Sequence, residues 1–119
     1  MKAFGMTLGL QDDPEKIRLY REHHQNVWPE VEASLRQVGI TLMRIFLLGK
    51  RLFMYMETVD EFEASRDFPK YLELDPKCKE WDSLMSTFQE KVKEAGPDEW
   101  WAVMDEVYTL EVSPHNAGQ

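Results

Sequence analysis

Residues 40–57 read ITLMRIFLLGKRLFMYME, and this stretch decides the fold. Residues 40–48 form a strongly apolar run, Gly49 and Lys50 follow, and a second apolar run covers residues 52–56. Two apolar runs that flank a short turn with glycine as its first residue are typical of a β-hairpin. The stretch therefore predicts two adjacent antiparallel strands in the middle of the chain.

The chain before this hairpin predicts a strand and an interrupted helix. Across residues 3–10 the larger apolar side chains take every second position. This is the period of a β-strand that carries its larger apolar side chains on one face. An aspartate N-cap followed by Pro14 then predicts a helix start. Pro29 lacks a backbone donor and disfavours helical geometry in the residue before it. We therefore expect the helix to break near Asn26, to restart at Pro29 and to end at Gly39.

The chain after the hairpin predicts a second interrupted helix and a last strand. Residues 60–74 have a helical pattern that Pro69 makes irregular, and Pro76 starts a further helix. The apolar residues of that helix recur at helical spacing: Trp81, Leu84, Met85, Phe88 and Val92. A glycine-proline pair then ends the helix, and residues 101–110 have the pattern of a strand.

The predicted order is strand, helix, strand, strand, helix, strand, with both helical regions interrupted. This order indicates the α+β class and the ferredoxin-like split βαβ sandwich, an antiparallel sheet with helices on one face. We expect one domain over residues 1–112 and a flexible C-terminal tail over residues 113–119. The second face of such a sheet has to be covered by a partner or a ligand. The predicted hairpin carries three aromatic residues that suit such a contact: Phe46, Phe53 and Tyr55. We therefore predict a homodimer.

The composition argues against several classes of function. A chain of 119 residues that is 43% hydrophobic and 30% charged has the balance of a globular protein. The net charge of -8 disfavours binding to nucleic acid or to an anionic membrane. No apolar run approaches the ~20 residues of a membrane span. A single cysteine, Cys78, and a start that does not resemble a signal peptide indicate a reducing, cytoplasmic setting.

The strongest chemical pattern is the run YREHHQNVWPE at residues 20–30. Tyr20 and His24 are four positions apart, so both project from one helix face, and Trp28 arrives where the helix breaks. A histidine can exchange a proton near neutral pH, and a neighbouring phenol can orient a substrate. Because aromatic rings also suit the C–H faces of sugars, the run predicts a sugar site.

Plainer interpretations compete with this one. On spacing alone, a histidine at a helix end is more often a hydrogen-bonded structural residue, and Trp28 with Pro29 fits a hydrophobic staple. His23 and His24 point about 100° apart, so they form no chelating pair, and we expect no metal site. Glu106, in an otherwise apolar strand, either faces solvent or is held at a site.

These residues resemble the L-rhamnose mutarotase family. The most specific element is the Tyr-x3-His-x3-Trp-Pro-Glu run, and compatible residues extend from position 2 to about position 110, including Gly39, the FMYME strand at 53–57 and Glu106. The resemblance implies a dimeric ferredoxin-like enzyme that interconverts the α and β anomers of a deoxy-aldose such as L-rhamnose, without a cofactor. It further implies that His24 is the proton donor and that Tyr20 binds the sugar.

The chain departs from the family pattern at two binding positions. Met43 stands where the family has a tyrosine, and Asp82 stands where the family has the second tryptophan of a pair that begins at Trp81. A thioether cannot hydrogen-bond like a phenol, and a carboxylate replaces an apolar wall. The expected substrate-binding set is therefore Tyr20, Trp28, Met43, Trp81 and Asp82, and the departures put the substrate in question before the type of reaction.

Mutarotation needs one acid and one base. We assign the acid to His24, which should then have an unshifted or raised pKa. Glu106 is the first candidate for the base or for the carboxylate that raises this pKa, and Asp82 is the second. Two other functions remain open: a non-catalytic sugar-binding dimer, and a ferredoxin-like monooxygenase.

Overall fold

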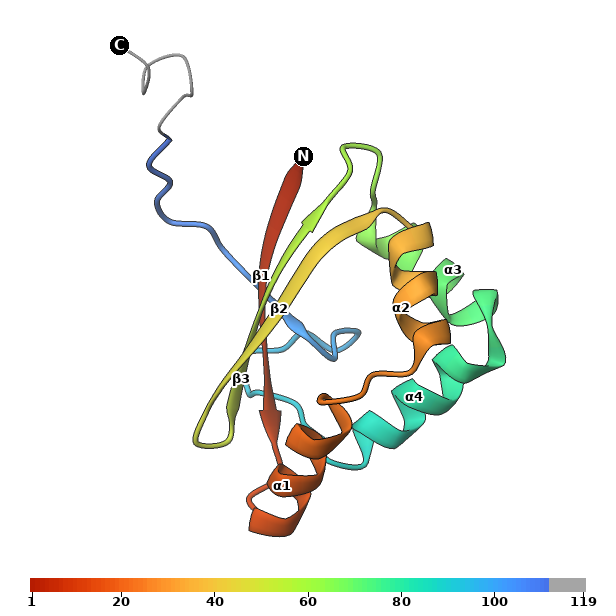
Figure 1. Ribbon diagram of the computed structural model, residues 1–119. Coiled ribbons are helices and arrows are strands. Elements are labelled where there is room, and N and C mark those ends of the chain that lie inside the picture. The colour runs from red at the N-terminus through yellow and green to blue at the C-terminus, as the bar shows by residue number, and fades with distance from the viewer. Residues whose placement is uncertain (112–119) are drawn as a thin grey trace.

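The computed structural model describes residues 1–111, and its elements follow the predicted order (Figure 1). They are β1 (Lys2–Leu10), α1 (Pro14–His23), α2 (Pro29–Gln37), β2 (Ile40–Leu48), β3 (Arg51–Thr58), α3 (Ala64–Leu74), α4 (Pro76–Ser86), β4 (Gln89–Glu90) and β5 (Ala102–Met104). The tail predicted at 113–119 lies outside the described residues. No helix among those described is long and apolar enough to cross a membrane.

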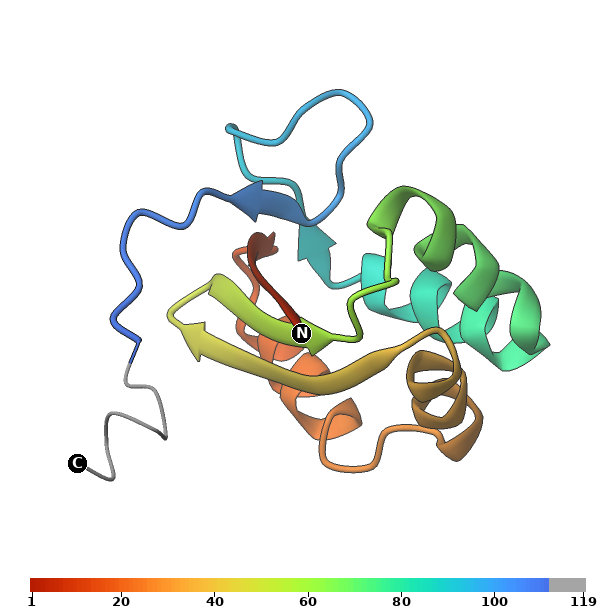
Figure 2. The same cartoon turned by 90° about the horizontal axis from the view of Figure 1, so that it is seen from above.

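The strands form one antiparallel sheet with the order β2-β3-β1-β4. The short strand β5 also pairs with β1, through Gly5 and Met104, so β4 and β5 share one edge of that strand. All four helices lie on one face of the sheet, as two views at right angles show (Figures 1 and 2). The predicted ferredoxin-like α+β fold is therefore confirmed.

The turns and helix breaks occur where the sequence predicts them. Gly49 adopts a φ of 61° in the hairpin turn, and Gly39, which ends the α2 region, adopts a φ of 105°. Residues other than glycine rarely adopt such φ angles. A Cβ atom at Gly39 would also lie 2.7 Å from the side chain of Val59. Prolines at positions 14 and 29 begin α1 and α2, and the chain leaves the helical path between them.

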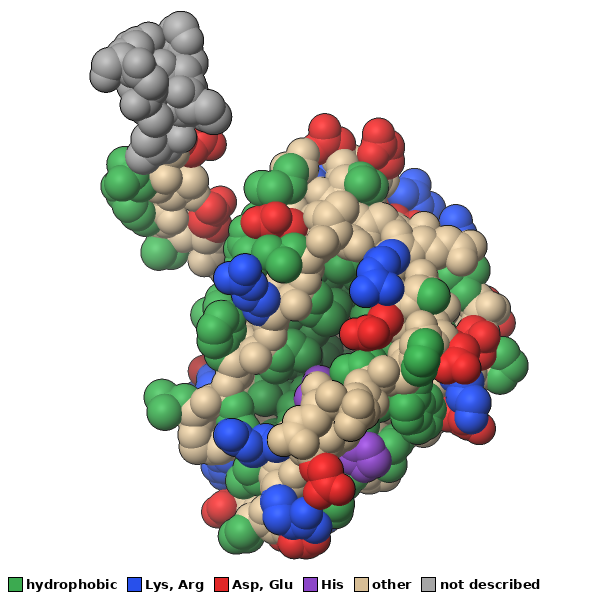
Figure 3. Space-filling view, viewed as in Figure 1, with side chains coloured by type: hydrophobic (Ala, Val, Ile, Leu, Met, Phe, Trp, Pro, Cys, Tyr) green, Lys and Arg blue, Asp and Glu red, His purple; other side chains and the backbone are tan. Residues whose placement is uncertain are grey.

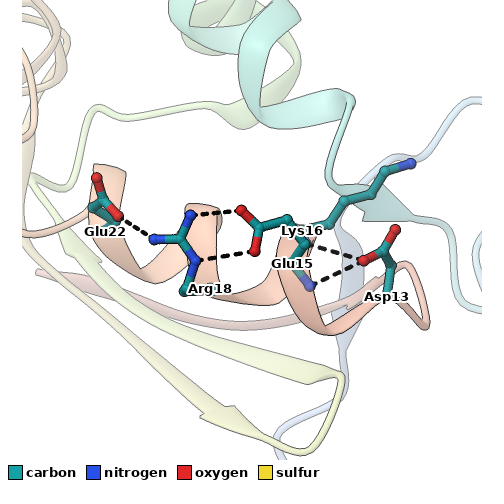
Figure 4. Close-up of polar contacts among 5 residues, drawn as sticks. All are labelled: Asp13, Glu15, Lys16, Arg18 and Glu22. Atoms are coloured by element: carbon teal, nitrogen blue, oxygen red, sulfur yellow. Dashed lines mark hydrogen bonds and ion pairs between the residues drawn. The ribbon is translucent and has the colours of Figure 1, made fainter.

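Helix α1 turns one face to solvent and the other to the sheet (Figure 4). Asp13 caps the helix by accepting a hydrogen bond from the backbone N–H of Glu15 at 2.9 Å. Arg18 then pairs with Glu15 on one side and with Glu22 on the other, and these exposed ion pairs contribute little to stability. Their arrangement leaves the opposite face, which carries Tyr20, to pack into the protein.

Two predicted elements are wrong in their extent. Helix α4 ends at Ser86 because the chain then turns to give Gln89 and Glu90 to the edge of β1, so the Phe88 and Val92 positions of the apolar stripe are not helical. The last strand covers only residues 102–104 of the predicted 101–110, because its pairing with β1 stops there.

The second face of the sheet is open to solvent in the single chain. Phe46 is 54% exposed and Phe53 is 37% exposed, and their rings stack with centroids 6.1 Å apart. The segment after β5 adds further exposed side chains, among them Val107, Tyr108 and Leu110. The homodimer prediction requires an exposed apolar surface, and this face has one. The dimer itself stays a prediction.

Candidate functional site

A cleft of about 1450 Å³ lies between the sheet and the helices. The space-filling view shows it as a hollow lined mainly by hydrophobic side chains (Figure 3). Side chains of β1, β2 and β3 line its sheet side, among them Met43, Met54 and Met56. Tyr20 and His24 of the first helix region line it from the other side, together with Trp81 and Asp82 of α4.

Tyr20 and His24 lie next to each other, as their spacing predicts. The two ring centroids are 4.2 Å apart, and His24 is the C-terminal cap of α1. The imidazole Nδ1 lies 2.8 Å from the backbone carbonyl oxygen of Tyr20. A carbonyl oxygen can only accept, so Nδ1 carries the hydrogen and Nε2 of the neutral ring keeps a free lone pair. The ring therefore has one nitrogen able to take up a proton.

The electrostatics of His24 contradict the prediction of an unshifted or raised pKa. Burial lowers the pKa of His24, and the neighbouring His23 lowers it further, against the opposing effect of the bond to the Tyr20 carbonyl. The imidazole is consequently uncharged at neutral pH. A neutral ring with an unprotonated Nε2 is suited to begin a reaction as a base.

Unlike the imidazole of His24, the phenol of Tyr20 carries a proton that it can donate. The residue is 4% exposed, and burial raises the pKa of its hydroxyl to about 12, although the side chain of Gln89 acts to lower it. The phenol therefore keeps its proton well above neutral pH. Beside a neutral imidazole it is a hydrogen-bond donor and a weak acid.

Trp81 forms an aromatic wall of the site and Trp28 supports it from behind. The rings of Trp81 and His24 pack in a T-shaped arrangement with centroids 5.5 Å apart, and the rings of Trp28 and Trp81 have centroids 5.1 Å apart. Trp28 is not among the residues that line the cleft. Its predicted role as a substrate contact is therefore not supported within the chain, and the ammonium of Lys77 lies 5.3 Å from its ring instead.

Met43 and Asp82, the two departures from the family pattern, both line the cleft. Met43 is half-buried on β2 and contributes an apolar surface. Asp82 is at the solvent-exposed end of the wall that Trp81 begins, and partial burial of its carboxyl group raises its pKa. The cleft thus has a carboxyl group on one wall and a thioether on its sheet side.

The structure does not bring Glu106 to this site. Glu106 follows β5, is exposed, and accepts a hydrogen bond from the hydroxyl of Thr109. It is absent from the cleft lining. The pKa of Tyr55 on the hairpin is raised mainly by the hydrogen bond of Tyr55 to Glu57, and the charge of Glu106 adds a smaller contribution. Its predicted role as base, or as the carboxylate beside His24, is wrong within one chain because the last strand ends before it.

The sequence predicts no site role for many of the residues that line the cleft, among them Tyr71, Gln89 and Trp100. Gln89 was assigned to a helix interior, and Tyr71 had the spacing of a core aromatic residue. The EWW run at 99–101 gave the one available signal, since adjacent tryptophans in a polar segment indicate a surface that binds something apolar. Within residues 1–111, no three His, Cys, Asp or Glu side chains are grouped so that they could hold a metal ion.

The chain is similar to sugar mutarotases over nearly its whole length. The family model described as L-rhamnose mutarotase matches residues 3–110. The L-fucose mutarotase of Xanthomonas campestris pv. campestris is 34% identical over 116 residues, which cover 92% of this chain and 89% of that protein. A UPF0734 protein of Dictyostelium discoideum is 46% identical over 113 residues, which cover 92% and 90% of the two chains.

One solved structure is similar as well. The L-rhamnose mutarotase of Formosa agariphila superposes with a TM-score of 0.66, over 93% of this chain and 100% of that one. At 18% identity this likeness concerns the fold alone. The matched residues of the family model include both the Tyr20–His24 pair and the wall of Trp81 and Asp82.

Proposed function

Because the chain belongs to the L-rhamnose mutarotase family, we propose that it interconverts the α and β anomers of a deoxy-aldose by acid–base opening of the sugar ring. The observation that carries the proposal is the contact of Tyr20 with His24, 4.2 Å apart between ring centroids, in a cleft walled by Trp81. A phenol that keeps its proton and an imidazole that lacks one are an acid and a base beside one ligand.

The ring opens as the bond between C1 and the ring oxygen breaks. Nε2 of His24 takes the proton of the anomeric hydroxyl, and the electron pair of that O–H bond forms the aldehyde carbonyl. The electrons of the broken bond go to the ring oxygen, which takes the proton of the Tyr20 hydroxyl. After rotation about the C1–C2 bond, closure on the other face returns one proton from the new hydroxyl to Tyr20 and one from His24 to the carbonyl oxygen.

In this scheme His24 acts as base on opening and as acid on closure. The open-chain intermediate is accompanied by an imidazolium and a phenolate, and the short distance between their rings stabilises this pair of opposite charges. Because mutarotation already proceeds in water, general acid and base contributions of roughly 10² to 10⁴ each are sufficient.

The relatives suggest L-fucose and L-rhamnose as substrates to test. In this chain a sugar hydroxyl near the wall of Trp81 would meet the carboxyl group of Asp82, and near β2 it would meet the thioether of Met43. The test is NMR saturation exchange between anomers of L-rhamnose, L-fucose and D-ribose, with and without the protein. Accelerated exchange of one sugar establishes the activity and its substrate. No acceleration of any of them by folded protein would contradict the proposal.

The decrease of kcat/KM at low pH tests whether His24 acts as a base. We expect kcat/KM to keep its neutral-pH value below about pH 6.5, where an ordinary histidine titrates, and to fall only as the pH drops through the lowered pKa of His24. The pH dependence of the exchange rate, corrected for the spontaneous rate at each pH, measures this decrease. An acid limb centred above pH 6.5 would contradict the lowered pKa of His24, and activity that instead falls as the pH rises through this range would show that His24 has to be protonated in the free enzyme.

We further propose that two copies pair through the open face of the sheet. Replacing Phe46 with glutamate places a charge within this apolar surface, so we expect a dimer of the wild-type chain and a monomer of Phe46→Glu. Light scattering after size-exclusion chromatography gives the mass of each. Gln37→Glu, which adds the same charge on exposed helix α2, should leave the dimer intact. A wild-type monomer, or a dimeric Phe46→Glu protein, would contradict this pairing.

A further inference from the structure

Gln89 and Trp100 meet in the lining of the cleft, and the reaction scheme above uses neither of them. Gln89 belongs to β4 and is 7% exposed. It pairs with Leu10 of β1, and residues directly opposite each other on antiparallel strands project on the same face of a sheet. Because Leu10 belongs to the core between the sheet and the helices, the side chain of Gln89 faces the helical layer as well.

The bond between these two residues gives the Gln89 amide a single orientation. The indole N–H of Trp100 donates to the amide oxygen of Gln89 at 2.7 Å. An indole nitrogen can only donate, so the amide oxygen faces Trp100 and the amide NH₂ group faces another direction. The backbone of Gln89 is held too, since its carbonyl accepts from the side chain of Gln11 at 3.4 Å. The amide therefore has a donor group left to offer.

The NH₂ group of Gln89 is open to the cleft. Every fully buried side-chain nitrogen or oxygen within residues 1–111 has a hydrogen-bond partner. No hydrogen bond joins this NH₂ group to another residue in that part of the chain, although the Gln89 side chain acts on the pKa of the Tyr20 hydroxyl. The group is consequently not fully buried, and an acceptor oxygen of a ligand can satisfy it.

Trp100 places an apolar surface beside this donor. It is 38% exposed although its N–H group is bound to Gln89. The carboxylate of Glu99 accepts from the backbone N–H of Gly96 at 2.8 Å and from that of Val103 at 3.2 Å, so the turn that carries Trp100 is closed at both ends. The indole is thus held before a ligand arrives, and little side-chain freedom is lost when one binds.

We propose that Trp100 and Gln89 form a sugar-binding subsite of the cleft, in which C–H groups of the pyranose pack on the indole and one sugar oxygen accepts from the Gln89 amide. A sugar needs both contacts, because its C–H groups are apolar and its oxygens need hydrogen-bond partners. The methyl group of a 6-deoxy sugar extends the apolar surface that an indole can cover. This inference takes its class of ligand from the proposed function and adds two binding residues to it.

The indole N–H of Trp100 reports on this subsite directly. It gives one NMR signal in ¹⁵N-labelled protein, which Trp100→Phe identifies by removing it. We expect L-fucose or L-rhamnose to shift the signal, and we expect Gln89→Met to shift it without sugar, because the accepting oxygen is lost. The indole signals of Trp28 and Trp81 in each sugar-free variant show whether the fold is kept.

Sugar affinity measures what each side chain contributes, with the Trp81 signal as the common probe. We expect the dissociation constant to rise about 10-fold in Trp100→Ala, as for a lost aromatic contact. In Gln89→Met it should rise about 3- to 10-fold, the worth of a hydrogen bond between uncharged groups. We expect kcat to stay within about threefold, because both contacts are made equally before and during ring opening. Gln37→Met, the same exchange on the surface of α2, should not change the affinity.

Anomeric exchange by the wild-type protein separates this inference from the proposed function. If the wild type exchanges a sugar that either Trp100→Ala or Gln89→Met binds with an unchanged dissociation constant, the subsite is wrong and the mutarotase function stands. If the wild type binds a sugar, and both variants bind it more weakly, but no exchange is accelerated, the function is wrong and the subsite stands. A wild type that neither binds nor exchanges L-fucose or L-rhamnose would overturn both.

Discussion

Replacing His24 with glutamine is expected to lower kcat/KM for anomeric exchange by about 10²- to 10⁴-fold. Glutamine keeps a polar group of similar reach, and its amide cannot take up the proton of the anomeric hydroxyl. The remaining activity would come from Tyr20 and from the binding of the sugar in the cleft. NMR saturation exchange at neutral pH measures the loss, because the spontaneous rate without protein can be subtracted.

His23 supplies a matched control for this experiment. It is the adjacent residue, and its ring packs against Phe88 at 5.7 Å between centroids, outside the cleft lining. We expect His23→Gln to keep activity within a few-fold of wild type. A His24→Gln protein that retained more than about a tenth of the wild-type kcat/KM would remove His24 from the chemistry. Unchanged sugar binding by such a protein would favour a binding module over an enzyme.

The sequence was sufficient for the order of elements and for the centre of the site. The turn at Gly49 and the breaks before Pro29 and after Gly39 depend on backbone properties of single residues, which hold in any tertiary context. The contact of Tyr20 with His24 follows from helical spacing in the same local way. Such features are readable because each depends on neighbours along the chain.

The features that could not be predicted from the sequence depend on contacts between residues far apart along the chain. Gln89 leaves the predicted helix because the edge of β1 offers it hydrogen bonds, and residues 105–111 leave the predicted strand because the pairing with β1 stops at Met104. Glu106 is consequently carried away from His24. The same limit explains the wrong sign for the pKa of His24, because burial between helix and sheet lowers it and burial is decided by the whole fold.

The helix break links the fold to the proposed chemistry. Pro29 starts a new helix, so α1 ends at His23 and His24 becomes its cap rather than an interior residue. The cap position places the imidazole Nδ1 on the carbonyl oxygen of Tyr20. The same carbonyl oxygen also accepts the last helical hydrogen bond of α1, from the backbone N–H of His24 at 3.3 Å. The tautomer that leaves Nε2 free for the sugar is thus set by the Tyr20 carbonyl oxygen at the C-terminal end of α1.

Phe62→Ala is expected to reduce the free energy of unfolding by about 3–5 kcal/mol, the largest stability effect that we predict for a single substitution. Phe62 is 1% exposed although it lies in the connection between β3 and α3. Its ring meets Phe4 of β1 at 5.8 Å and Phe68 of α3 at 5.5 Å between centroids, edge to face in both cases. It therefore connects the sheet to the helical layer, and its removal leaves a cavity bordered by both.

The backbone around Phe62 limits how far this cavity can close. The Phe62 carbonyl accepts from the ammonium of Lys2 at 2.7 Å, and its N–H donates to the carbonyl of Val59. Because these bonds hold the loop, the neighbouring rings cannot move fully into the space, and the loss should lie in the upper part of the range for large-to-small substitutions. Urea unfolding at one fixed protein concentration measures it, since association would otherwise shift the midpoint. Phe62→Leu, which keeps most of the volume, should cost about 1 kcal/mol. A loss below about 1.5 kcal/mol in Phe62→Ala would show that the sheet and helices close over the gap and that this ring does not join the two layers.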